Sequence, residues 1–285
     1  MNSSFLVTPQ WLAEHIDDTN TVILDARMSP PGLIPKRNIQ AEFEQGHIPG
    51  AVYFDIDSIA DSSTDLPHML PSPQVFSEMV GQLGVSEQHT LVIYDDGNLF
   101  SAPRVWWTLR IFGAQNVYIL AGGFSGWQQA DFALESGPTF PTPQTFNATF
   151  NDAAVKNVHE VLAVLGNNEI QILDARPAAR FKALEPEPRA GLRLGRIPGS
   201  INVPWGSMVE NGNLKSPQEL EAIFAAQGVD LTKPIITSCG SGVTAAVVAL
   251  GLAAAVNAPS VALYDGSWAE WGTSDSLPID SAKLS

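Results

Sequence analysis

The chain has 285 residues, of which 45% are hydrophobic and 16% are charged. This length accommodates two domains of ordinary size, and the composition is that of a globular protein rather than a disordered one. The formal net charge is −15, from 30 acidic and 15 basic side chains. Because an acidic protein is repelled by phosphate backbones and by anionic lipid surfaces, we expect no nucleic-acid partner and no membrane partner.

The N-terminal segment MNSSFLVTPQWLAEHIDD has neither the basic start nor the long apolar run of a signal peptide. Cys239 is the only cysteine. No internal disulfide can form, and the reducing cytoplasm is the expected compartment. The five histidines form no H-x-x-x-H or cysteine–histidine pattern, and no G-x-G-x-x-G sequence follows a strand. We therefore expect no metal and no cofactor.

Taken in chain order, short β-branched runs alternate with helix-like segments. The expected strands of the first half are TVILD (21–25), AVYFD (51–55), TLVIYD (90–95) and VYILA (117–121). Those of the second half are EIQILD (169–174), SINVP (200–204), PIITS (234–238) and SVALYD (260–265). Runs that are apolar on both faces indicate an α/β fold, with a mostly parallel sheet flanked by helices on both sides.

The two halves repeat the same short motifs in the same order. The motif DAR ends at Arg27 and again at Arg176, an offset of 149 residues, and GHIPG returns as GRIPG at the same offset. A Pro-, Thr- and Asn-rich stretch at 135–151 separates the halves and has the composition of a linker. This is the tandem duplication of one domain type. We predict an N-terminal domain at 1–136, a linker at 137–154 and a C-terminal domain at 155–285.

Cys239 lies between an expected strand and an expected helix. PIITS ends at Ser238, the loop CGSGVT follows, and a helix-like apolar run begins at Thr244. A lone cysteine is most often a small buried hydrophobic residue. A glycine-bearing loop at the carboxyl end of a strand can instead turn backbone N–H groups towards one point, and the helix adds its positive end. That setting favours a nucleophilic thiolate and a persulfide anion.

The tandem DAR and G-[HR]-I-P-G motifs, together with the six-residue loop CGSGVT, resemble the rhodanese superfamily of sulfurtransferases from about residue 5 to about residue 278. The loop is similar to that of the members that use 3-mercaptopyruvate. The resemblance implies two rhodanese-like domains with catalysis in the second. Cys239 would take the donor's sulfur as a persulfide, release pyruvate, and pass the sulfur to a thiol or to cyanide, with thioredoxin as one candidate acceptor.

The resemblance also assigns roles to individual residues. Arg180 and Arg189 match the substrate-binding arginines, whose planar fork suits the donor's carboxylate, although either could form a surface salt bridge instead. Asp57, His68 and Ser241 match a proton relay to the substrate, which would combine residues from both halves. Four loop residues offer backbone N–H groups around the sulfur, namely Gly240, Gly242, Val243 and Thr244.

Three other positions are expected to be structural. Alignment of the halves puts Asp95 where Cys239 stands, and a carboxylate cannot form a persulfide, so the N-terminal domain should be catalytically inactive. Arg176 belongs to the DAR motif that both halves share, which favours a structural pairing. Arg196 replaces the histidine that is usual in GHIPG, and we expect a structural effect at most.

Alternative functions remain open at this point. A thiosulfate:cyanide sulfurtransferase typically has basic residues directly after the cysteine, whereas Gly240 and Ser241 are neutral. A phosphatase of the same fold needs the loop C-x5-R, and its arginine position holds Ala245. A P-loop-like phosphate site would need the lysine of G-x-x-x-x-G-K-[ST], which is absent. A non-enzymatic sulfur-carrier module is compatible with the cysteine loop.

Overall fold

The computed structural model describes residues 5–255 and 260–281. The chain divides into two compact units. Unit 1 comprises Met1–Ser62, Leu70–Asn151 and Asn211–Asn213, and unit 2 comprises Ser63–Met69, Asp152–Glu210 and Leu214–Ser285. Each unit therefore includes one short segment that belongs, by sequence, to the other half of the duplication.

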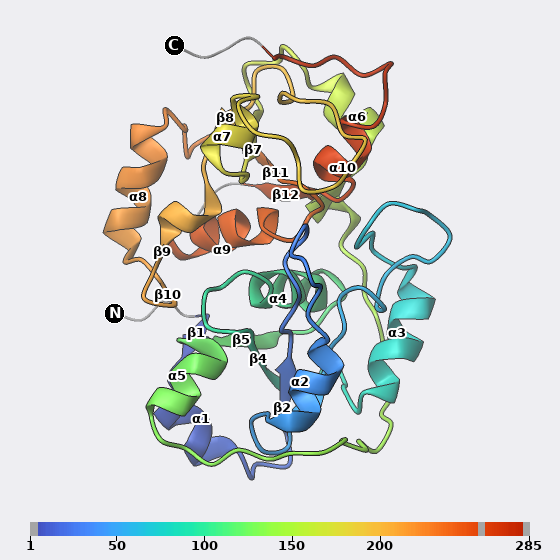
Figure 1. The fold of residues 1–285 in the computed structure, drawn as a ribbon, viewed down its shortest axis with the longest axis vertical. Helices are drawn as coiled ribbons and strands as arrows, with labels where there is room; N and C mark the ends of the chain where they lie inside the picture. The colour runs from blue at the N-terminus through green and yellow to red at the C-terminus, as the bar shows by residue number, and fades with distance from the viewer. Residues whose placement is uncertain (1–4, 256–259, 282–285) are drawn as a thin grey trace. The chain divides into compact units, whose positions relative to one another are not determined.

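The sheet of unit 1 has five parallel strands in the order β1-β5-β4-β2-β3 (Figure 1). The strands are β1 (Leu6–Val7), β2 (Thr21–Asp25), β3 (Val52–Tyr53), β4 (Thr90–Tyr94) and β5 (Asn116–Leu120). The helices are α1 (Pro9–His15), α2 (Ile39–Gln45), α3 (Pro73–Gln82), α4 (Ala102–Ile111) and α5 (Gly123–Gln129).

One face of this sheet is covered by α1, α2 and α5. Their buried side chains Leu12, Phe43 and Trp127 form one cluster with Ile23 and Val92 of the central strands. Figure 1 shows α4 across the opposite face. Side-chain caps begin several of these helices: a Thr8 oxygen caps α1, and Asn38 and Ser72 cap α2 and α3. The layered arrangement is that expected for a parallel sheet.

Unit 2 repeats this topology. Its five parallel strands follow the order β6-β12-β11-β7-β8, which corresponds position by position to the order in unit 1. The strands are β6 (Val155–Lys156), β7 (Gln171–Asp174), β8 (Ile201–Asn202), β11 (Ile235–Ser238) and β12 (Val261–Tyr264). A separate pair is formed by β9 (Val209–Glu210) and β10 (Asn213–Leu214).

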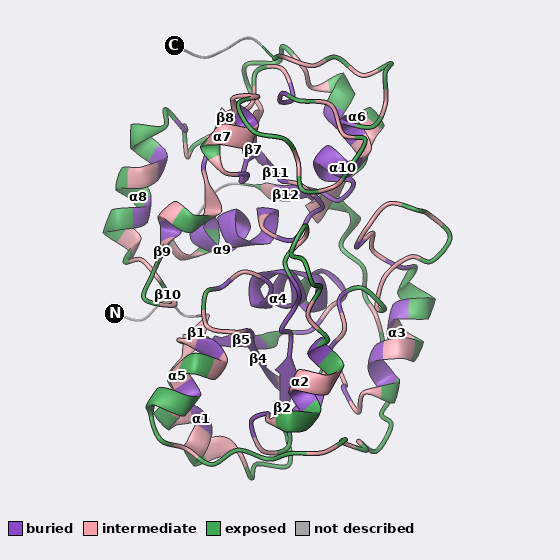
Figure 2. Cartoon of the chain, in the orientation of Figure 1, coloured by how far each residue is buried: buried purple, intermediate pink, exposed green. Residues whose placement is uncertain are grey.

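The helices of unit 2 are α6 (Val158–Ala163), α7 (Ala178–Phe181), α8 (Pro217–Ala226), α9 (Ala245–Ala255) and α10 (Ser267–Trp271), with 3-10 turns at η1 (Asp152–Ala154) and η2 (Trp205–Met208). Val161 of α6 and Trp268 and Trp271 of α10 pack on one face of the sheet, against Ile172 and Ile236. Helix α9 follows the central strand β11 and is buried along most of its length, as is α4 in unit 1 (Figure 2).

The predicted α/β fold with two duplicated parallel sheets is confirmed. The eight expected strands are present, although AVYFD and SINVP contribute only two paired residues each. Residues of the expected linker are hydrogen-bonded to unit 1, where Gln144 donates to Gly81 and Thr149 donates to Phe112, both at 2.9 Å. The domain limits themselves stay predictions. None of the described helices has the length and apolar character of a membrane span.

Candidate active site

Cys239 follows the last residue of β11, at the carboxyl end of the central strand. In that strand Ser238 pairs with Asp174 of the second DAR motif. The loop then runs from Cys239 to Thr244, and α9 begins at Ala245. Cys239 is a free cysteine and is 2% exposed. The strand–loop–helix setting inferred from the sequence is therefore present in unit 2.

The start of the loop is held by the beginning of α10. The carbonyl of Cys239 accepts the N–H of Trp268 at 2.9 Å, and the carbonyl of Gly240 accepts the N–H of Ala269 at 2.8 Å. The N–H of Cys239 donates to the hydroxyl oxygen of Ser267 at 3.2 Å. Ser267 was not predicted as a site residue, although GGFSGW (122–127) returns in the second half as DGSWAEW (265–271), which indicates that this segment has a role in both halves.

His68 contacts Ser241 of the cysteine loop. Its ring nitrogen Nδ1 lies 3.1 Å from the Ser241 hydroxyl oxygen and 3.2 Å from the Ser241 carbonyl oxygen. Both side chains are buried, His68 at 6% and Ser241 at 4% exposure. A carbonyl oxygen can only accept a hydrogen bond, so Nδ1 must carry a proton when it bonds the Ser241 carbonyl. When Nδ1 accepts from the Ser241 hydroxyl, it carries no proton. The pair can thus exist in two protonation arrangements.

Asp57, the third residue of the expected relay, belongs to unit 1. Its carboxylate forms an ion pair with Lys36 at 3.1 Å, in which both side chains are substantially exposed. Asp57 also lines a cavity of about 520 Å³ together with Lys36, Tyr53 and Asp55. The participation of Asp57 in a proton relay with His68 and Ser241 stays a prediction.

Glu187 links two arginines in unit 2. Its Oε1 accepts from Arg176 at 2.7 Å and its Oε2 lies 3.5 Å from Arg180, while its own side chain is 2% exposed. Arg180 is the more exposed of the two arginines, with 25% of its side chain accessible to solvent. Glu187 restricts the directions that the Arg180 fork can take. This role of Glu187 was not predicted from the sequence.

Arg176 has the structural role that its repetition suggested. It forms a two-point pair with Asp174, with the shorter contact at 2.6 Å, and also donates to the carbonyl of Gly195 at 2.9 Å. Its guanidinium lies 4.2 Å from the ring centre of Trp268. Burial on its own would lower the pKa of Arg176, but the carboxylates of Asp174 and Glu187 raise it above the ordinary value. These contacts give Arg176 a structural role in unit 2.

The other predicted residues of the site are placed in or near the same loops. Gly242 and Val243 are buried in the cysteine loop, whereas Gly240 and Thr244 are partly exposed. Gly242 has a φ of 78°, a conformation that glycine adopts at low cost. Arg189 is partly exposed in the loop after α7. Its contact with a donor stays a prediction, as does the role of the loop N–H groups.

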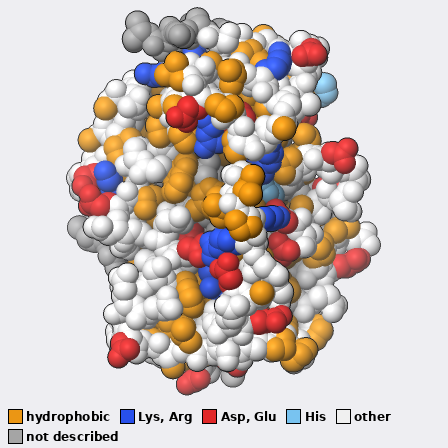
Figure 3. Space-filling view, in the orientation of Figure 1, with side chains coloured by type: hydrophobic (Ala, Val, Ile, Leu, Met, Phe, Trp, Pro, Cys, Tyr) orange, Lys and Arg blue, Asp and Glu red, His pale blue; other side chains and the backbone are white. Residues whose placement is uncertain are grey.

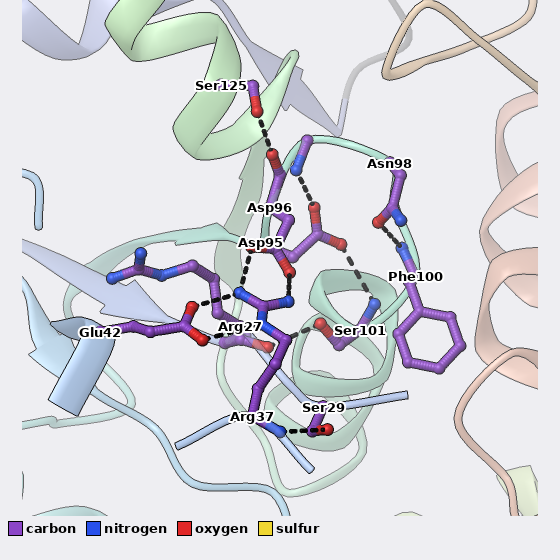
Figure 4. Close-up of polar contacts among 12 residues, drawn as sticks. Arg27, Ser29, Arg37, Glu42, Asp95, Asp96, Asn98, Phe100, Ser101 and Ser125 are labelled. Carbon is purple, nitrogen blue, oxygen red and sulfur yellow. Dashed lines mark hydrogen bonds and ion pairs between the residues drawn. The ribbon is translucent and has the colours of Figure 1, made fainter. Parts of the chain in front are cut away.

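The equivalent loop of unit 1 surrounds a carboxylate instead of a sulfur (Figure 4). Asp25 pairs with Tyr94 as Asp174 pairs with Ser238, so the next residues, Asp95 and Cys239, occupy equivalent positions. The Asp95 carboxylate accepts the N–H groups of Gly97, Ser101 and Ala102 at 2.9, 3.1 and 3.1 Å. Burial raises the pKa of Asp95, and these three donors oppose the shift. Three backbone N–H groups of this loop thus point towards one carboxylate.

A cation next to this loop is also fully engaged. Arg37 donates to both oxygens of Asp96 at 2.8 Å and to Glu42, as Figure 4 shows. The hydrogen bonds to Asp96 and Glu42 raise the pKa of Arg37 far above its ordinary value. The positive charge of Arg37 is therefore already paired with the carboxylates of Asp96 and Glu42.

Arg196 makes structural contacts within unit 2. It is buried at 3% exposure, pairs with Asp280 at 2.6 Å, and lies 5.1 Å from the ring centre of Phe181. His47 has the equivalent place in unit 1, where it stacks on Phe43 at 4.0 Å and bridges to Glu135 through the backbone. Each of these residues pairs through its backbone with a segment that follows the last helix of its unit.

Two further features of the described residues are the distribution of acidic side chains on the surface and the arrangement of residues that could bind a metal ion. Acidic side chains are dispersed over the face shown in Figure 3 rather than gathered in one patch. Within residues 5–255 and 260–281, no group of three or more His, Cys, Asp or Glu side chains is arranged to hold a metal ion.

Comparison with known proteins gives a consistent set of matches. The rhodanese-like domain family matches residues 8–130 and 157–274. The 3-mercaptopyruvate sulfurtransferase of Escherichia coli K12 is 53% identical over 283 residues, which cover 99% of this chain and all of that protein. The thiosulfate sulfurtransferase of Rattus norvegicus is 42% identical over 274 residues, covering 93% and 91% of the two chains.

A solved structure agrees with these matches. The crystal structure of SseA from Escherichia coli, described as a 3-mercaptopyruvate sulfotransferase with the rhodanese fold, superposes with a TM-score of 0.87 at 52% identity. The match covers 93% of this chain and 99% of that chain. The similarity thus extends over both units.

Proposed function

Because the chain belongs to the rhodanese-like domain family, we propose that it is a sulfurtransferase that uses 3-mercaptopyruvate as its sulfur donor. The observation that carries the proposal is the buried free thiol of Cys239 in a loop whose Ser241 is bonded to His68. The 53% identity to a 3-mercaptopyruvate sulfurtransferase supports the choice of donor.

In the first half-reaction, the Cys239 thiolate attacks the sulfur of the donor. An S–S bond forms, the C–S bond breaks, and its electron pair passes to the methylene carbon as the enolate of pyruvate. That enolate takes one proton and leaves as pyruvate, while Cys239 keeps the sulfur as a persulfide. The Ser241 hydroxyl and the His68 imidazole are the proton-transfer groups, and Asp57 is the proposed third member of the relay.

In the second half-reaction, a thiolate acceptor attacks the outer sulfur of the persulfide. The Cys239 thiolate is regenerated, and the acceptor leaves as its own persulfide; cyanide leaves as thiocyanate. We propose thioredoxin as one such thiol acceptor. We also propose the cytoplasm as the site of action, since a chain with one cysteine forms no internal disulfide and so does not need an oxidising compartment.

Donor recognition is assigned to Arg180 and Arg189. A planar guanidinium binds a carboxylate through two parallel hydrogen bonds, and mercaptopyruvate carries its carboxylate away from the reacting sulfur. Arg180 is oriented by Glu187 and partly exposed, which suits a residue that must meet a small anion. Thiosulfate instead places anionic oxygens beside the sulfur, where Gly240 and Ser241 supply no charge.

The test is a side-by-side measurement of kcat/KM with mercaptopyruvate and with thiosulfate, together with the intact mass after incubation with each donor alone. Wild-type protein should prefer mercaptopyruvate and gain the mass of one sulfur atom. The Cys239→Ser variant should show neither the added mass nor turnover. A Cys239→Ser variant that still turns over would refute the mechanism, and a preference for thiosulfate would refute the donor.

A further inference from the structure

Ser267 adopts a backbone conformation that serine rarely takes. Its φ is 49°, in the left-handed region, and the residue is completely buried. Residues other than glycine carry a steric cost in this region because of their Cβ atom. Such a conformation persists only where the surroundings impose it, and residues of this kind are concentrated at functional sites. The presence of a side chain at this position, where glycine would cost less, therefore calls for an explanation.

The equivalent position of unit 1 is a glycine. Gly123 has a φ of 53° and stands 144 residues before Ser267, the offset that also separates Asp95 from Cys239. In unit 1 the next residue, Phe124, donates to the Asp95 carbonyl at 2.8 Å, just as Trp268 donates to the Cys239 carbonyl at 2.9 Å. The backbone geometry is thus shared, but only the half with the cysteine has a hydroxyl there.

The Ser267 hydroxyl joins the backbone of Cys239 to the end of β12. Its oxygen accepts the N–H of Cys239 at 3.2 Å, and it donates its own proton to the carbonyl of Tyr264 at 2.8 Å. All three residues are buried, so each of these polar groups needs a hydrogen-bond partner within the protein. The bond fixes the peptide plane that precedes the Cys239 side chain.

We propose that Ser267 is a positioning residue for the nucleophile: its hydroxyl holds the Cys239 N–H and thereby fixes the direction in which the thiol leaves the loop. The inference rests on the proposed role of Cys239. Attack on the donor's sulfur requires an in-line approach, and a small misalignment of the nucleophile lowers the rate without altering donor affinity. Arg180, which is proposed to bind the donor, belongs to α7 and not to the cysteine loop.

The decisive variants are Ser267→Gly and Ser267→Ala. Glycine adopts a φ of 49° freely, so Ser267→Gly removes the hydroxyl together with the steric cost, whereas Ser267→Ala removes the hydroxyl alone. At a temperature where circular dichroism shows the variants folded, we expect kcat with mercaptopyruvate to fall about tenfold, with KM within about twofold of wild type. The rate of Cys239 alkylation by iodoacetamide should change as well.

The matched control is Asp131→Gly, which relieves a similar φ of 58° at an exposed position of unit 1. It should leave kcat, KM and alkylation unchanged. Wild-type kcat in both Ser267 variants would overturn the positioning role, while the Cys239-dependent activity would still stand. Failure of both Ser267 variants to fold would also overturn it, because the hydroxyl would then be required for the fold itself. A wild type inactive with both donors would refute the proposed function.

Discussion

The ring nitrogen Nδ1 of His68 lies 3.1 Å from the hydroxyl oxygen of Ser241, although 173 residues separate the two in the sequence. If this pair transfers the proton that converts the enolate into pyruvate, Ser241→Ala and His68→Gln should each lower kcat with mercaptopyruvate by about 10². The double variant should lose little more than either single variant, because both changes remove the same function.

His89→Gln is the control for this pair, since the His89 ring accepts the Ser86 N–H in unit 1 and belongs to no predicted site. Its kcat should equal that of wild type. Multiplicative losses in the Ser241→Ala/His68→Gln double variant would mean that the two residues act independently and that the relay is wrong.

The arginine assignment predicts a loss of donor binding. Arg180→Ala and Arg189→Ala should each lower kcat/KM for mercaptopyruvate about ten- to a hundredfold, because each removes a charge-assisted contact worth roughly 1.5–3 kcal/mol. Lysine at either position should restore only part of the loss, since it has no planar fork. Steady-state kinetics measure this, with Lys182→Ala as the control for a neighbouring cation. Kinetics unchanged in both alanine variants would make these residues ordinary surface pairs.

Asp95→Cys should not create a second sulfur site. The loop of unit 1 is built around a carboxylate with three N–H donors, and its neighbour Arg37 is already bound to Asp96 and Glu42. We would combine Asp95→Cys with Cys239→Ser, so that the only thiol is the new one, and record the intact mass after incubation with mercaptopyruvate. An added sulfur atom on this double variant would contradict the catalytic silence of unit 1.

Charge in the cysteine loop should select the donor. A side chain at Gly240 would start in open space, because no atom lies within 4 Å of its Cβ position. Gly240→Arg should therefore move the ratio of kcat/KM towards thiosulfate by about tenfold or more, through one new charge-assisted contact. Gly240→Gln controls for size without charge. Because the single change leaves Ser241 in place, an unaltered ratio would reject this explanation of donor choice without involving the relay.

The second half of the sequence should not work alone. A fragment of residues 155–285 contains Cys239 and Arg180 but lacks Ser63–Met69, the segment of unit 2 that carries His68. We expect its kcat with mercaptopyruvate to be at least 10² lower than that of the full chain, as for loss of the relay. Addition of the separate first half should restore part of it. Full activity of the fragment would show that His68 is dispensable.

The parts of this structure that repeat were open to prediction, and the parts that differ between the repeats were not. The position of Cys239 between β11 and α9 followed from a buried β-branched run, glycines and an apolar helix. The register of Asp25 with Tyr94 and of Asp174 with Ser238 then confirms that Asp95 is the counterpart of Cys239. These features could be predicted from the sequence because each depends on residues that are close together along the chain.

The contacts that sequence did not predict join residues with no common pattern. Glu187 bridges Arg176 and Arg180 because a loop folds back, and nothing in EPEPR distinguishes the buried glutamate from its exposed neighbour. The two-residue strands β1 and β6 are too short to show a period. Ser267 differs from its counterpart Gly123 by one side chain, whose significance is visible only once φ is known.

The exchange of Ser63–Met69 and Asn211–Asn213 between the two units sets an order of events at the ribosome. His68 emerges 173 residues before its partner Ser241, a wait of roughly 10 to 35 s at ordinary elongation rates. During that time the nascent first half also lacks Asn211–Asn213, the piece whose Gly212 carbonyl accepts the Gly122 N–H. Unit 1 is complete only once Asn213 has been made, and unit 2 only once the last residues of the second half have been made, so neither unit can be completed before synthesis of the second half is under way.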